Sequence, residues 1–168
     1  SFIANLASNH KEDANYIAVD MIEAMLGLSK RNIEEKYNFE DPENLYLIRA
    51  NVEQILNVFS KEDGIERIYI NFCNPWPKKK HHKRRLMQRP RTNLLTQKLY
   101  EGGYVYMATD WEPYAEFALE ELNLTSNLKN KYEGFAPHQE WRPETKFEHK
   151  GLVAERKISE IFFVKEDL

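Results

Sequence analysis

The sequence predicts an α/β protein built on a parallel sheet. Short runs rich in β-branched and aromatic residues recur along the chain, and segments with helical apolar spacing separate them. This alternation of strand and helix is typical of parallel sheets. The chain has 168 residues, of which 42% are hydrophobic and 30% charged, enough to bury one core. We therefore expect a single domain over residues 1–168.

The expected elements follow one another with short connections. The strands are predicted over residues 15–20, 44–50, 65–72 and 104–110. The helices between and after them are predicted over residues 21–37, 52–59, 92–100 and 111–122.

Local signals mark two boundaries and the last strand. Gly102-Gly103 predicts a break before the fourth strand, and Asp110, followed by Glu112 and Pro113, predicts a helix start. A polar stretch over residues 135–151 then leads into ERKISEIFFVK (155–165), which we expect to contain the final strand.

Composition excludes several classes of protein. No apolar run approaches the roughly 20 residues of a membrane span, so we expect a soluble, cytoplasmic protein. The lone cysteine, Cys73, excludes an internal disulfide and a multi-cysteine zinc site, and is expected to pack at a strand end. His81 and His82 are too close together for an ordinary shared metal site and have no acidic or cysteine companions, so no metal is expected.

Positive charge is concentrated in one segment. The net charge is −3, but residues 78–91 hold eight Lys or Arg and no acid, which leaves 16 basic and 27 acidic residues elsewhere. A focused basic patch on an otherwise acidic chain attracts polyanions such as nucleic acid. A solvated loop or a targeting signal is the alternative, although targeting signals seldom lie between a buried strand and a helix.

Polar residues stand at the predicted strand ends, where ligands of parallel sheets bind. They are Asp20, Asn51, Asn74 and Asp110. A carboxylate ending the second strand of a nucleotide-binding unit bonds a ribose about 20 residues after a glycine-rich turn. Counting back from Asp20 puts that turn before Ser1, so we expect the chain to begin inside the first helix, without the first strand and its glycine-rich loop. An ordinary turn-forming Asp is the alternative.

Three segments in order carry a family resemblance. INFCNPWPKKKHHKRR (70–85), MATDW (107–111) and WRPETKFE (141–148) resemble the signatures of bacterial TrmB-type tRNA (guanine-N7)-methyltransferases, whose fourth-strand motif usually reads FxDPWxKxxHxKRR. The similarity runs from about residue 15 to residue 164. It implies a Rossmann-like class I methyltransferase sheet, mostly parallel with an antiparallel C-terminal edge. It also implies S-adenosylmethionine as cofactor, tRNA as partner and guanosine 46 of the variable loop as target. We expect a monomer or homodimer.

The resemblance also implies roles for particular residues. Asp20 would hold the cofactor ribose, Asn51 would lie near the adenine, and Asn74 would stand beside the methyl donor as the catalytic residue. The guanosine would be surrounded by Lys78, Asp110, Thr145, Lys146, Phe147 and Glu148. The phosphates would be held by the basic segment, including Lys80, His81, His82, Lys83, Arg84 and Arg85. Asn51 and Asn74 depart from the family, which commonly has Asp at both positions.

The chemistry of guanine sharpens these expectations. N7 carries a lone pair and no proton, so its methylation needs no general base, and Asn74 is expected to position groups rather than to remove a proton. Guanine presents N1–H and N2–H₂ side by side, and a carboxylate such as Asp110 or Glu148 accepts two such bonds. Asp110 can equally be a helix N-cap, Glu148 can simply be exposed, and Phe147 and Trp76 can stack on the base or belong to the core.

Two other functions remain open from the sequence. NPW also resembles the N-P-P-aromatic motif of amino-group methyltransferases, in which an amide and a backbone carbonyl accept bonds from a nucleobase amine. Trp76 replaces the second proline of that motif here. The other alternative is a non-catalytic RNA-binding domain, which the missing glycine-rich loop would fit.

Overall fold

The computed structural model describes residues 2–20, 23–38, 40, 42–60, 62–142 and 156–166. Its contacts divide the chain into two compact units. Unit 1 comprises Ser1–Ile55 and Glu140–Lys146, and unit 2 comprises Leu56–Gln139 and Phe147–Leu168. No helix within the described ranges is long and apolar enough to cross a membrane.

Unit 1 is built on a pair of parallel strands. Its elements, in chain order, are α1 (Phe2–Asn9), β1 (Tyr16–Asp20), α2 (Glu23–Lys36), β2 (Leu45–Arg49) and the start of α3 (Val52–Val58). Strands β1 and β2 pair in register, with Asp20 opposite Arg49 at the end. The buried Asn44 joins the surrounding segments, because its side-chain nitrogen donates to the Ala7 carbonyl at 3.0 Å and its oxygen accepts from the Tyr37 hydroxyl at 2.8 Å.

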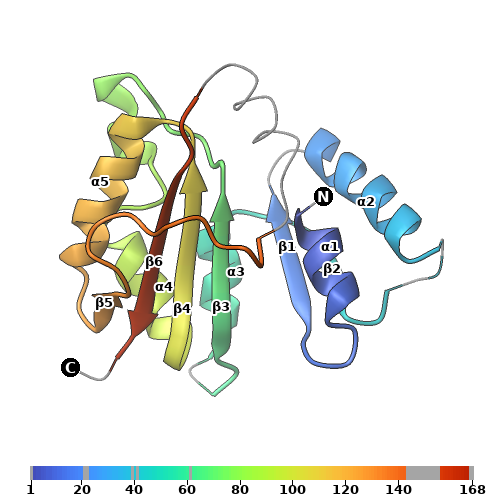
Figure 1. Cartoon of the computed structure of the whole chain (residues 1–168). Coiled ribbons are helices and arrows are strands. Elements are labelled where there is room, and N and C mark those ends of the chain that lie inside the picture. Colours follow the sequence, from blue (N-terminus) through green and yellow to red (C-terminus); the bar gives the residue numbers. More distant parts are fainter. Residues whose placement is uncertain are drawn as a thin grey trace. The chain divides into compact units, whose positions relative to one another are not determined.

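Unit 2 contains a four-stranded mixed sheet. Its elements are β3 (Ile65–Asn71), the 3₁₀ helix η1 (Lys79–Arg84), α4 (Arg91–Lys98), β4 (Leu99–Thr109), α5 (Glu112–Asn123), β5 (Leu128–Asn130) and β6 (Ser159–Lys165). The strands lie side by side in the order β3-β4-β6-β5 (Figure 1). β3 and β4 are parallel, whereas β6 is antiparallel to both of its neighbours. β6, the last of these strands along the chain, therefore lies inside the sheet.

The central strands carry the core of unit 2. Residues 105–109 of β4 and 159–163 of β6 are all buried, and most of them are apolar, as expected for strands covered on both faces. Helix α5 buries Tyr114, Ala118 and Leu122, spaced four residues apart along one face. The apolar spacing seen in the sequence thus corresponds to the buried face of this helix.

The expected break at Gly102-Gly103 is wrong, because β4 already begins at Leu99 and continues through both glycines. The ladder with β3 shifts here: Ile65 pairs with Leu99 but Arg67 pairs with Tyr104, so the glycines lie in a bulge. A Cβ on Gly103 would meet the Glu66 carbonyl oxygen at 2.6 Å, and Gly102 has a φ of +84°. Glycine therefore permits a bulge within the strand. The preceding helix consequently ends at Lys98, before the predicted boundary at residue 100.

The other expectations for the fold are largely confirmed. The first three predicted strands, the four helices and the last strand all form close to their predicted positions. The α/β class with an antiparallel edge is confirmed, although the edge strand is β5 and the C-terminal strand β6 lies next to it inside the sheet. A helix also covers the start of the chain, as expected. The sequence reading missed β5, which is only 3 residues long, and η1, which forms within the basic segment.

Candidate functional site

The ends of β3 and β4 bring two predicted site segments to one edge of unit 2. Asn71 pairs with Ala108 in the parallel ladder, so the chain leaves both strands at the same edge. The Phe72 amide still donates to the Ala108 carbonyl at 2.9 Å, which holds the exit from β3 against β4. The loop with Asn74 and the turn with Asp110 therefore start from neighbouring strand ends.

The loop after β3 adopts a conformation that bulky residues rarely take. Phe72 and Trp76 have φ values of +50° and +45°, in the left-handed region. Such residues cost about 1–3 kcal/mol each and persist only when their surroundings fix them. The side-chain oxygen of the exposed Asn74 accepts a bond from the Trp76 amide at 3.0 Å, closing a local turn. Asn74 thus has a structural role as well as its predicted functional one.

The basic segment forms a 3₁₀ helix whose cations do not all face solvent. Those that are exposed are Lys78, Lys79, Lys80, Lys83 and Arg84. His81 and His82 are half-buried: the His81 ring lies edge-on to Trp76 with centroids 5.8 Å apart, and a His82 ring nitrogen lies 3.3 Å from the Pro77 oxygen. The predicted phosphate-binding surface is therefore narrower than the charge run.

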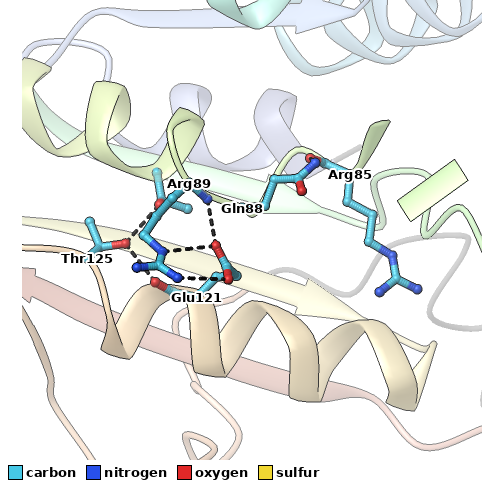
Figure 2. A network of polar contacts seen from close by, with 6 residues as sticks. Arg85, Gln88, Arg89, Glu121 and Thr125 are labelled. Atoms are coloured by element: carbon cyan, nitrogen blue, oxygen red, sulfur yellow. Dashed lines mark hydrogen bonds and ion pairs between the residues drawn. The ribbon is translucent and has the colours of Figure 1, made fainter. Parts of the chain in front are cut away.

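The remaining arginines of the run, Arg85, Arg89 and Arg91, all make contacts within the protein, although Arg89 itself is exposed. Arg85 is only 2% exposed, so its side chain does not share the surface of its neighbours. Figure 2 shows Arg89 beside Glu121 of α5, to which its backbone amide donates at 2.7 Å and its guanidinium at 3.3 Å. Burial alone would raise the pKa of Glu121, but the bonds from Arg89 outweigh it and hold that pKa below its ordinary value. Arg91 donates to the Arg85 carbonyl at 2.8 Å.

Cys73 packs against Tyr114 of α5 just after the end of β3, in agreement with the strand-end packing expected for it. Its thiol lies 3.4 Å from the hydroxyl of Tyr114, which also accepts the Met87 amide at 3.1 Å. Burial raises the pKa of Cys73, and the hydrogen bond to Tyr114 only partly opposes this shift. The thiol is therefore protonated at neutral pH and is a poor nucleophile.

Asp110 is not the N-cap of α5, contrary to one of the roles considered for it. Trp111 occupies that position, and no side chain caps the helix. An oxygen of Asp110 instead lies 2.7 Å from a guanidinium nitrogen of Arg156, with the two side chains 24% and 51% exposed. Sequence reasoning missed Arg156. The sequence just before β6 contains no pattern that predicts an ion pair between this arginine and Asp110, which is far away in the chain.

Two of the three predicted cofactor residues, Asp20 and Asn51, lie in unit 1 at the ends of neighbouring parallel strands. Asp20 ends β1, and its carbonyl accepts the Ala50 amide at 3.2 Å. The side-chain oxygen of Asn51 accepts the Glu53 amide at 2.8 Å, and the Gln54 side chain accepts the Asn51 amide at 3.3 Å. Asn51 and Gln54 thus form a reciprocal cap at the start of α3. Asp would serve as well in this cap, so the cap does not distinguish Asn51 from the Asp that is common in the family.

The predicted guanosine site includes four further residues. Thr145, Lys146, Phe147 and Glu148 lie outside the described residues.

Residues 1–161 match the protein family described as "Putative methyltransferase". Two proteins named "tRNA (guanine-N(7)-)-methyltransferase" are similar over 151 residues, or 90% of this chain: one from Francisella philomiragia at 38% identity and one from Treponema pallidum at 40%. The chain covers 64% and 58% of their lengths, which is less than two thirds of either.

Solved structures share the fold at low identity. A precorrin-6y C5,15-methyltransferase from Geobacter metallireducens superposes with a TM-score of 0.60 at 14% identity, covering 95% of this chain and 72% of that one. The N-methyltransferase NodS from Bradyrhizobium japonicum, solved with S-adenosyl-L-homocysteine, gives 0.54 at 11% identity, covering 90% and 66%. The α/β arrangement seen here is thus the fold of known methyltransferases.

Proposed function

This chain belongs to the methyltransferase family that matches residues 1–161, and on that premise we propose that it methylates N7 of a tRNA guanosine. Following the family resemblance of its motifs, the target is guanosine 46 of the variable loop. The observation that carries the proposal is the Asn74-Pro75-Trp76 loop, which joins a strand end to an exposed row of cations. A cytoplasmic monomer or homodimer fits a tRNA substrate.

The exposed part of the basic segment supports binding to an RNA backbone. Lys and Arg side chains contact phosphates and thereby position a nucleic acid without reading its sequence. Five exposed cations on or next to η1 directly follow the Asn74 loop, so they can hold phosphates close to it. His81 and His82 support this surface indirectly, because they pack against Trp76 and Pro77 of the loop that precedes η1.

Asp110 supports selection of guanine. Its carboxylate has about four acceptor positions, so it can keep the bond to Arg156 and still accept from the N1–H and N2–H₂ of a guanine. Adenine presents an acceptor at the corresponding ring position, and that acceptor would face the carboxylate unfavourably. Lys78 is exposed where the loop enters η1 and is a second candidate contact for the base or its phosphate.

The polar groups at the strand ends of unit 1 fit S-adenosylmethionine. The Asp20 carboxylate can accept the ribose hydroxyls. Asn51 uses its side-chain oxygen in the cap of α3, so its amide nitrogen is the group that can donate to the adenine. When bound, this cofactor supplies an electrophilic methyl group on a positively charged sulfur. Asn74 would orient the guanine, whose N7 has no proton for a base to remove.

The reaction product tests the proposal directly. We expect the protein, incubated with bulk tRNA and methyl-labelled S-adenosylmethionine, to form 7-methylguanosine, identified by nucleoside analysis. Formation of N6-methyladenosine instead would refute the proposal in favour of amino-group methylation, which the Asn-Pro-aromatic sequence alone would also allow. If the protein binds tRNA but not S-adenosylmethionine, the non-catalytic RNA-binding alternative is correct.

Asn74 offers a test of its two roles. We expect Asn74→Asp to keep the product and a rate within about threefold, because a carboxylate can accept the Trp76 amide as the amide oxygen does. Asn74→Ala removes this bond and should lower the rate about 10- to 100-fold through loss of position. Single-turnover rates at saturating tRNA give the comparison. A folded but inactive Asn74→Asp variant would show that an amide donor is required, which is contrary to N7 chemistry.

A further inference from the structure

Arg85 connects the Asn74-Pro75-Trp76 loop to helix α5. Its Nε donates to the Pro75 carbonyl at 2.8 Å. Its guanidinium lies over the rings of Tyr114 and Phe117, 5.2 and 4.8 Å from their centroids. We propose that Arg85 is a positioning residue that fixes this loop for methyl transfer, and that it makes no contact with RNA. This inference rests on the proposed function.

The backbone of Arg85 is held as firmly as its side chain. Its amide donates to the His82 carbonyl at 3.0 Å. Its carbonyl accepts from the side chains of Gln88 and Arg91, both at 2.8 Å. Figure 2 shows Gln88 next to Arg85, above α5. The backbone bonds fix where the Arg85 side chain starts, and turning that side chain toward solvent would give up its bond to Pro75 and its contacts with the rings of α5, which a phosphate would have to replace.

The 3₁₀ geometry explains why adjacent arginines have different surroundings. Residues three apart lie on the same side of a 3₁₀ helix. His82 and Arg85 both approach Phe117, with centroid distances of 6.4 and 4.8 Å. His81 and Arg84 both approach Trp76, at 5.8 and 5.0 Å. One side of the turn therefore packs on α5, while the next side packs on the loop and leaves Arg84 exposed.

The hydrogen bond from Arg85 to the Pro75 carbonyl lies at the most constrained part of the loop. Pro75 lies between Asn74 and Trp76, whose φ is +45°. The Asn74 side chain closes the turn on one side, and Arg85 holds the intervening carbonyl on the other. A guanidinium bound to a carbonyl and lying over two aromatic rings makes a directional contact that a lysine ammonium cannot reproduce. Loss of this contact should release Asn74 and Trp76 together.

The test measures catalysis, RNA affinity and loop protection for Arg85→Ala and Arg85→Lys, with Arg84→Ala as the neighbouring comparison. For both Arg85 variants we expect single-turnover methyl transfer at saturating tRNA to fall about 10- to 100-fold. Amide hydrogen exchange in a peptide spanning residues 72–78 should become about tenfold faster. The slope of log affinity for tRNA against log salt should stay unchanged. Arg84→Ala should instead lower that slope by up to about one unit.

Each other outcome decides against the inference or against its premise. If Arg85→Ala lowers the salt slope and Arg85→Lys restores it, Arg85 contacts phosphate and the inference is wrong. Unchanged loop exchange in a folded Arg85→Lys variant also overturns it, and this variant decides the matter if Arg85→Ala does not fold. Failure of the unaltered protein to form 7-methylguanosine would count against the proposed function alone, because loop exchange and salt slope need no turnover.

Discussion

Gly103→Ala is expected to lower the free energy of unfolding by about 3 kcal/mol, because the new methyl group has no space within the bulge of β4. Its Cβ would meet the Glu66 carbonyl oxygen at 2.6 Å and the Tyr100 carbonyl oxygen at 2.9 Å. Both are backbone atoms, so relief requires β3 to move away at Glu66 and the backbone of β4 to change at Tyr100. Chemical denaturation followed by circular dichroism measures the change.

Gly102→Ala is the matched control for this effect. Nothing lies within 4 Å of the position of its Cβ, but its φ is +84°. This variant should therefore lose only the about 1–2 kcal/mol that a left-handed backbone costs a residue with a side chain. Equal losses for the two variants would mean that the strands give way at Gly103 and that the bulge is not tightly packed.

Asp110→Asn should lower kcat/KM for tRNA about 100-fold, because hydrogen bonds to a charged group contribute about 1.5–3 kcal/mol each. The new amide nitrogen would face the donors of guanine where a carboxylate oxygen had accepted them. It would also weaken the contact with Arg156 at 2.7 Å. Steady-state methylation of tRNA gives the change, and Glu112→Gln, an exposed neighbour that also loses one charge, is the control.

Variants of Arg156 test whether Asp110 binds guanine itself or acts only through its pairing with Arg156. If Asp110 binds the base itself, Arg156→Gln should reduce kcat/KM much less than Asp110→Asn. If the two single variants and the double variant are equally impaired, Asp110 acts through its pairing with Arg156. That result would contradict the proposed role of Asp110 in selecting guanine.

The sequence was sufficient to locate the strand ends that form the candidate site. Strands and helices alternate with clear periodicities, and the ends of parallel strands lie at one edge, so the positions of Asn74 and Asp110 follow from the pattern. Asn51 and Asp20 likewise stand at the ends of paired parallel strands. What a residue contacts there was harder to foresee, as the partners of Asn51 and Asp110 illustrate.

The missed features depend on contacts that no local pattern contains. Gly102 and Gly103 look like a chain break, and only the neighbouring Glu66 backbone reveals a bulge in a continuous strand. Eight cations in one run look alike, whereas the turn of η1 and the rings of α5 decide that Arg85 is buried and Arg84 is exposed. A charge run therefore predicts a basic surface without predicting which of its members form it.

The position of β6 within the sheet has a consequence for how the chain folds during synthesis. β6 lies between β4 and β5, and Tyr104 pairs with Val164, so this ladder joins residues far apart in the chain. In the described part of unit 2, β5 pairs only with β6. While the ribosome is still making the segment before Ser159, β4 has one exposed edge and β5 has no partner in the sheet. The described sheet of unit 2 can close only after β6 has been made, and until then β4 is open to pairing with other chains.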